Sequence, residues 1–190
     1  MTTQPATINL KRRRFSVDEY HQLAEVGILS EQDKVELIHG EIIEMSPIGP
    51  KHSGNLDRLS QFLTLFFRDA AIVRVQSPVQ LGSDSEPEPD LSVLKARNDF
   101  YTTSHPQAAD ILLVVEFSDS SLNYDQNVKL PLYAIHNIPE AWIIDLQEDR
   151  VLVFQDPKGE AYLSIHTYQR GDSIASSIQN LEISVDELLG

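Results

Sequence analysis

The chain of 190 residues contains no cysteine. A disulfide framework, a thiolate zinc cluster and a cysteine nucleophile are therefore excluded, and this composition fits a reducing compartment, so we expect a cytoplasmic protein. Long hydrophobic runs are also absent. The longest, residues 111–115, is far shorter than the roughly 20 residues that span a bilayer, and residues 1–14 lack the apolar segment of a secretion signal. We expect no membrane partner.

Basic residues are scarce. The chain has 15 lysines and arginines against 29 acidic residues, a formal net charge of −14. This is the wrong sign for a protein that holds a polyanion by counterion release alone, so any contact with nucleic acid must be local, metal-assisted or weak. The only basic run, residues 11–14, is interpreted as part of a flexible, solvated N-terminal tail over residues 1–14.

Two catalytic signatures are missing as well. There is no glycine-rich phosphate loop and no Gly-x-Ser-x-Gly elbow, so neither P-loop nucleotide hydrolysis nor serine-hydrolase chemistry is supported. The length is that of about one domain, and no internal repeat divides it. We therefore expect one domain over residues 15–190.

The hydrophobic pattern predicts an α/β (α+β) fold with a mixed central sheet flanked by helices. Ser16 and Glu19 have the spacing of a capping box, which predicts a helix from Val17 to near Gly27, and Gly40 marks a bend between two short apolar elements. Further predicted elements are a helix over 53–68, strands over 73–81 and 90–94, a central strand over 111–115, a helical segment over 128–135, a buried strand over 141–145, a hairpin of 151–154 with 162–168, and a short final helix capped by Ser184 with Glu187.

Acidic residues stand where this sheet should be apolar. Asp90 opens one strand, after a turn-rich acidic loop over 83–89, and Glu116 directly follows the most hydrophobic strand. Burying an unpaired charge costs several kcal/mol, so such carboxylates need a hydrogen-bond network, a cation or a proton. Mg²⁺ or Mn²⁺ suits two carboxylates together with a backbone oxygen, for which the Phe117 carbonyl is available. Loop capping or pairing with lysines is the alternative.

Several blocks of the sequence, taken in order, carry a resemblance. They are Val35-Glu36-Leu37-Ile38-His39-Gly40-Glu41, His52, Pro87-Glu88-Pro89-Asp90-Leu91-Ser92-Val93, Val115-Glu116-Phe117-Ser118, Tyr124-Asp125, Lys129, Tyr133 and Ile138-Pro139-Glu140-Ala141-Trp142-Ile143-Ile144-Asp145. Together they resemble the Uma2 (DUF820) family of restriction-type endonucleases, within the PD-(D/E)XK nuclease superfamily. The resemblance runs from about Phe15 to Tyr168.

This resemblance implies a restriction-endonuclease-like core in which Asp90 and Glu116 bind the metal. Ser118 stands where the superfamily's short signature has its lysine, and Lys129 is similar to the migrated lysine of this family. Without the resemblance, Lys129 is as readily explained by a solvated ion pair with Asp125 one helical turn earlier.

The resemblance also extends to residues around these three. Glu36 looks like the family's additional upstream acid, with Glu41 the weaker substitute. His52 matches a histidine at a helix start, where contact with a phosphate, orientation of Glu36 and a hydrogen bond to backbone all remain open. The other histidines show no close metal-ligand spacing, so exposed or packing roles are favoured for them.

The activity that this family implies is metal-dependent hydrolysis of DNA phosphodiester bonds, with double-stranded DNA as substrate. A homodimer would present two active sites to the two strands. The alternatives are a catalytically inactive nuclease fold that serves as a nucleic-acid or protein binding module, which the charge of −14 and the missing lysine at position 118 favour, and a homodimeric scaffold whose buried acids close loops.

Overall fold

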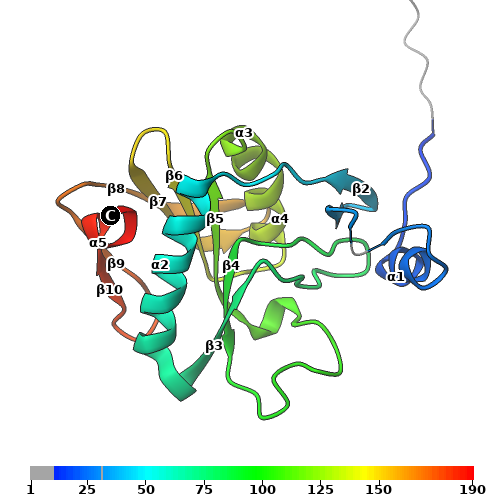
Figure 1. Cartoon of the computed structure of the whole chain (residues 1–190), viewed down its shortest axis with the longest axis horizontal. Helices are drawn as coiled ribbons and strands as arrows, with labels where there is room; N and C mark the ends of the chain where they lie inside the picture. Colours follow the sequence, from blue (N-terminus) through cyan, green and yellow to red (C-terminus); the bar gives the residue numbers. More distant parts are fainter. Residues whose placement is uncertain (1–10, 31) are drawn as a thin grey trace, which may run out of the picture.

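A mixed six-stranded sheet forms the centre of the computed structural model, which describes residues 11–30 and 32–190 (Figure 1). The strand order is β3-β4-β5-β6-β7-β8. β5 (Ile111–Ser118) and β6 (Glu140–Asp145) are parallel and every other neighbouring pair is antiparallel. The remaining strands of this sheet are β3 (Ala71–Val75), β4 (Leu91–Lys95), β7 (Arg150–Lys158) and β8 (Ala161–Gln169). The predicted α/β class with a mixed sheet is confirmed.

Helices cover both faces of this sheet. α2 (Pro50–Phe67) buries Leu59 and Leu63 against one face, together with α5 (Val185–Leu189) and the small hairpin of β9 (Ser173–Ala175) and β10 (Glu182–Ser184). The other face packs against α4 (Leu130–Ile135). Each fully buried leucine of this kind contributes about 1.5–3 kcal/mol of transfer free energy. Two separate apolar clusters thus sandwich β5 and β6, which explains their continuous hydrophobic sequence.

Side chains along β5 alternate between these clusters. Leu113, Val115 and Phe117 belong to the α2 side, whereas Val114 belongs to the α4 side. Alternation therefore places Glu116 on the α4 side. The sequence pattern placed Glu116 directly after a strand. In the structure it lies within β5, because the strand continues to Ser118.

The N-terminal part forms an outlying layer. α1 (Val17–Glu25) begins with the predicted capping box of Ser16 and Glu19, and a hairpin of β1 (Val35–Ile38) and β2 (Glu41–Glu44) follows. His39 and Gly40 both adopt positive φ in its turn, as a type I′ two-residue turn requires. A Cβ on Gly40 would meet Phe15 O at 2.9 Å, so only glycine fits there.

Several predicted boundaries were wrong. α2 begins at Pro50 and not at residue 53, since Pro50 is favoured in the first helical turn. β3 ends at Val75: Val79 and Leu81 are fully buried, but in an irregular segment that contains Pro78, so alternation there reports burial without a strand. The predicted helix over 128–135 is composite, with α3 (Leu122–Tyr124), a π-helical turn η3 (Asp125–Lys129) and α4. Pro131 lacks the N–H of a regular helical bond, which explains the widened turn.

The described part of the predicted tail, residues 11–14, is largely exposed, and its arginines form ion pairs. Arg12 lies 3.4 Å from Glu41, and Arg13 pairs with Glu19. The predicted flexibility of residues 1–10 lies outside the described residues. Among the helices of the described part, none is long and apolar enough to cross a membrane.

Candidate active site

A cavity of about 670 Å³ lies where β5 ends, between the β1–β2 hairpin, the start of α2 and the turn η3. It is the place where the sequence-predicted site residues meet, although they come from five different segments of the chain. Its lining includes all six of them, namely Glu36, His52, Asp90, Glu116, Phe117 and Lys129.

Asp90 stands directly before β4 and is held from two sides. Its Oδ2 accepts a hydrogen bond from Phe117 N at 2.8 Å, and its Oδ1 lies 2.9 Å from His52 Nε2. His52 is in the first turn of α2, and its ring leans on Phe117 with 5.6 Å between ring centroids. One role left open for His52 was the orientation of Glu36. In the structure His52 contacts Asp90 instead.

The Phe117 carbonyl faces the same side of β5 as Asp90. In a strand, the N–H and C=O of one residue point to the same edge, and the Phe117 N–H points to Asp90. Continuing the register from Leu91 opposite Val115 places Pro89 opposite Phe117. Because proline has no N–H, Pro89 cannot donate a hydrogen bond to this carbonyl, which favours the Phe117 oxygen as a ligand for a cation.

Glu116 is a buried carboxylate surrounded by polar groups. Its Oε1 accepts a short hydrogen bond from Tyr133 Oη and lies 3.2 Å from Lys129 Nζ, while its Oε2 accepts a bond from Asp90 N at 3.4 Å. Burial raises the pKa of Glu116 to about 8; the charge of Lys129 opposes this shift and that of Asp90 adds to it. Without a further cation, the pocket therefore disfavours the charged form of Glu116.

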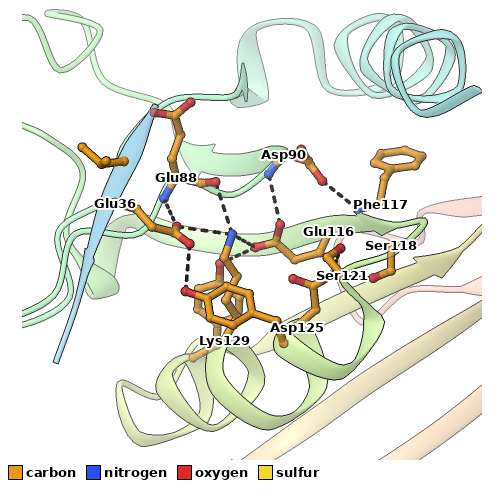
Figure 2. Close-up of polar contacts among 12 residues, drawn as sticks. Glu36, Glu88, Asp90, Glu116, Phe117, Ser118, Ser121, Asp125 and Lys129 are labelled. Atoms are coloured by element: carbon orange, nitrogen blue, oxygen red, sulfur yellow. Dashed lines mark hydrogen bonds and ion pairs between the residues drawn. The ribbon is translucent and has the colours of Figure 1, made fainter. Parts of the chain in front are cut away.

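Lys129 points from η3 into the same pocket, as Figure 2 shows, and its side chain is only 7% exposed. Its Nζ lies 3.4 Å from Glu36 Oε2 and donates to the Glu88 carbonyl at 3.4 Å, in addition to the contact with Glu116. Burial alone would lower the pKa of Lys129, but the charges of Glu116 and Glu36 outweigh burial and raise it. Lys129 is thus held as a cation.

Lys129 forms ion pairs with Glu36 and Glu116, and not the solvated pair with Asp125 that the sequence also allowed. Asp125 is itself buried and accepts hydrogen bonds from Ser118 Oγ at 2.6 Å and Ser121 Oγ at 2.7 Å. Ser118 stands where the resemblance had implied a lysine. Its hydroxyl anchors the turn that presents Lys129 (Figure 2).

Of the two candidate upstream acids, Glu36 is the one at the site. It is 2% exposed on β1, and its carboxylate accepts hydrogen bonds from Tyr124 Oη and Glu88 N, each at 3.0 Å. Glu41 does not line the cavity and faces Arg12 and Arg14. Glu36 therefore fixes the loop before Asp90 as well as the lysine.

The donor set fits a hard divalent cation. Asp90, Glu116 and the Phe117 carbonyl offer only oxygen, as Mg²⁺ and Mn²⁺ prefer. Seven acidic residues but only two lysines line the cavity, which is a surplus of acidic groups, and burial disfavours the charged form of Glu116 among them. A bound cation would offset this surplus.

Two features of the molecule escaped the sequence analysis. Tyr133 belongs to the sequence blocks that carry the resemblance, but no role at the site was predicted for it. It is fully buried, but its hydroxyl also binds Glu116, and its spacing of four residues from Lys129 on one helix was the signal available. The second feature is a group of three side chains, His21, Glu86 and His105, whose ligand atoms lie within 4.8 Å of one another. Exposed or packing roles had been favoured for both histidines.

A match to a family model gives the class of protein to which this chain belongs. The family model for Uma2, described as "Putative restriction endonuclease", matches residues 17–186, so the chain belongs to the Uma2 family. The resemblance inferred from the sequence blocks is confirmed, and nucleases of this class generally use divalent metals.

A solved structure has the same fold. It is titled as a putative nuclease belonging to DUF820 from Anabaena variabilis ATCC 29413, with a TM-score of 0.72 and 16% sequence identity, and the match covers 92% of this chain and 97% of that one. A comparison with curated proteins gives no match.

Proposed function

We propose that this chain is a magnesium-dependent endonuclease that hydrolyses phosphodiester bonds in double-stranded DNA. The observation that supports this most is the convergence of Asp90, Glu116 and Lys129 at one strand end, inside a cavity, in a chain of the Uma2 family. Mn²⁺ has the same ligand preferences and is expected to substitute.

The roles of the side chains follow from their contacts. Asp90, Glu116 and the Phe117 carbonyl would hold Mg²⁺, which when bound supplies positive charge to the phosphate and makes a water more acidic. His52 keeps Asp90 oriented through Oδ1. Lys129, held as a cation beside Glu116 and Glu36, stabilises negative charge that develops on the phosphate.

Glu36 acts through Lys129 and the loop before Asp90. Its carboxylate fixes the Lys129 ammonium and the Glu88 N–H at the same time. Loss of Glu36 would let both move while the oxygen donors for the metal remain. We therefore assign Glu36 a positioning role.

We also propose that the chain acts on duplex DNA as a homodimer. One active site cuts one strand, so cleavage of both strands by a homodimer requires two sites related by a two-fold axis. Sedimentation equilibrium of the protein with and without a DNA duplex measures this directly. A monomer under both conditions would contradict the dimer.

The experiment for the activity is cleavage of supercoiled plasmid DNA with Mg²⁺ or Mn²⁺, compared with EDTA. The variants Asp90→Asn, Glu116→Gln and Lys129→Gln keep side-chain size while removing charge. Matched controls are Asp57→Asn, an exposed acid on α2, and Lys158→Gln, an exposed lysine on β7. Removing a charge that acts in the transition state costs about 10²–10³-fold in rate.

The proposal predicts nicked or linear plasmid with the wild type and both controls, and loss in the three site variants. Equal cleavage by the wild type and all three site variants would show a contaminating nuclease and contradict this active site. Metal-dependent DNA binding without any cleavage, on a panel of supercoiled, linear and branched DNA, would contradict the endonuclease and identify a binding module instead.

A further inference from the structure

The group formed by His21, Glu86 and His105 comes from three separate segments. His21 lies on α1, Glu86 on the loop between β3 and β4, and His105 on the loop between β4 and β5. His21 Nε2 lies 2.8 Å from Glu86 Oε1 and 3.0 Å from Oε2, and the two imidazole rings are 5.9 Å apart between centroids. One ligand atom from each residue lies within 4.8 Å of the other two.

Backbone hydrogen bonds tie the loop that carries Glu86 to α1, to β1 and to the loop that carries His105. Val17 N, at the start of α1, donates to Ser83 O at 2.9 Å. Glu86 N donates to Leu37 O at 2.7 Å, and Gln80 N donates to Pro106 O, next to His105, at 2.8 Å. The side chains are therefore presented by a fixed framework, which lowers the cost of organising a binding site.

Burial distinguishes this group from a chance surface cluster. Glu86 is 4% exposed, yet no lysine or arginine pairs with it among the described residues; its ion-pair partner there is His21. Both histidines are half-buried and line a hollow of about 530 Å³ that opens to solvent. The hollow reaches the two imidazoles, and His21 in turn contacts the buried carboxylate of Glu86, which needs a cation or hydrogen bonds in this position.

We propose that His21, Glu86 and His105 bind a first-row transition metal, with zinc the best fit. Two imidazoles and one carboxylate are ligands that suit Zn²⁺, whereas Mg²⁺ prefers oxygen alone. Ligand atoms about 2.1 Å from a tetrahedral zinc lie about 3.4 Å from one another, so the atoms need to approach by at most about 1.4 Å. Water from the hollow that both histidines line could supply a fourth ligand.

This site is separate from the proposed magnesium site. None of its three residues lines the cavity that holds Asp90 and Glu116. The bound ion would join α1 and the loop that carries His105 to the loop that leads into Asp90. The inference does not rest on the proposed nuclease activity, and the two can fail independently.

The experiment is isothermal titration with ZnCl₂ after removal of metals by EDTA and dialysis, together with a Co²⁺ titration followed by visible absorption. The variants are His21→Gln, His105→Ala and Glu86→Gln. The controls are His166→Ala, an exposed histidine on β8, and Asp90→Asn, which removes the other metal site. Circular dichroism checks that each variant is folded.

We expect one zinc ion at this site in the wild type and in both controls. Loss of a ligand should weaken its affinity by at least about 100-fold, because even loss of a group that only supports a ligand costs 10–100-fold. The Co²⁺ absorption band should disappear in His105→Ala, which alters only a loop. Zinc should also slow tryptic cleavage at Arg97, in the loop before His105, in the wild type but not in His105→Ala.

Two results would overturn this site. One is that Asp90→Asn abolishes all of the zinc binding that the wild type shows. The other is a folded His105→Ala that binds zinc and Co²⁺ as the wild type does.

Discussion

The hydroxyl of Tyr133 is the best place to test whether Glu116 ionises in the pocket. Tyr133 is fully buried and donates to Glu116 Oε1, so Tyr133→Phe removes one hydrogen bond without changing the packing. Tyr162→Phe is a matched control: its buried hydroxyl donates at 2.9 Å to the Ile138 carbonyl, which carries no charge at any pH. Burial raises the pKa of both tyrosines, so each remains a donor at pH 9.

The expected magnitudes depend on the charge of Glu116. The folded pKa of about 8 lies above the ordinary 4.5, so the unfolded state ionises first, and stability is lost as the pH rises from about 4.5 to about 8. Below this folded pKa, Tyr133→Phe removes a neutral hydrogen bond and lowers the free energy of unfolding by about 0.5–1.5 kcal/mol. Above it the acceptor is charged, and the loss is about 1.5–3 kcal/mol. The difference between these two losses corresponds to a pKa of Glu116 that is about one unit higher in the Tyr133→Phe variant than in the wild type.

The assay is urea denaturation of metal-free protein at pH 6 and pH 9, with circular dichroism as the readout. The loss caused by Tyr133→Phe should grow by about 1–1.5 kcal/mol between the two pH values, at an unchanged m value. The loss caused by Tyr162→Phe should stay near 1 kcal/mol at both. A Tyr133→Phe loss that is the same at pH 6 and pH 9 would refute ionisation of Glu116 beside this hydroxyl.

Three further predictions concern stability and binding. Ser92 Oγ is the buried side-chain atom in the described part of the chain that has no hydrogen-bond partner, so Ser92→Ala should raise the free energy of unfolding by about 1 kcal/mol in urea denaturation; a loss would show an unseen partner. Glu140 is fully buried and accepts hydrogen bonds from Trp142, Gln155 and Ser177. Glu140→Gln turns an NH₂ group toward these donors and should lower the free energy of unfolding by at least about 2 kcal/mol. An unchanged melting temperature would contradict this network. Because acidic residues dominate the cavity, a gel-shift assay should show DNA binding in Ca²⁺ and little in EDTA; equal binding in both would place the DNA elsewhere.

The central sheet and its helices were predictable because burial leaves a strong periodic pattern. The continuous apolar run 111–115 and the stripe through Leu59 and Leu63 report cores on both faces of the sheet. The pattern was misleading where burial and strand pairing diverge, as at Val79 and Leu81. The strands β9 and β10 have three residues each, too few for a period to be seen.

The site was predictable only in part. Asp90 and Glu116 stood out as acids in an apolar context, but the contact of Lys129 with Glu116 and Glu36 follows from the turn η3, whose widening a sequence pattern does not report. His21 and Glu86 are 65 positions apart and meet only because loops fold back on α1. Contacts at such separations are set by tertiary packing and leave no local signal.

Calorimetric titration of Mg²⁺ tests the proposed metal site most directly, because it needs no knowledge of the DNA target and because Mg²⁺ avoids the histidine ligands of the second site. The wild type and Asp57→Asn are predicted to bind Mg²⁺, and Asp90→Asn and Glu116→Gln, shown by circular dichroism to be folded, are predicted to lose this binding. Mg²⁺ binding that is untouched by either substitution at Asp90 or Glu116 would contradict the assignment of this site.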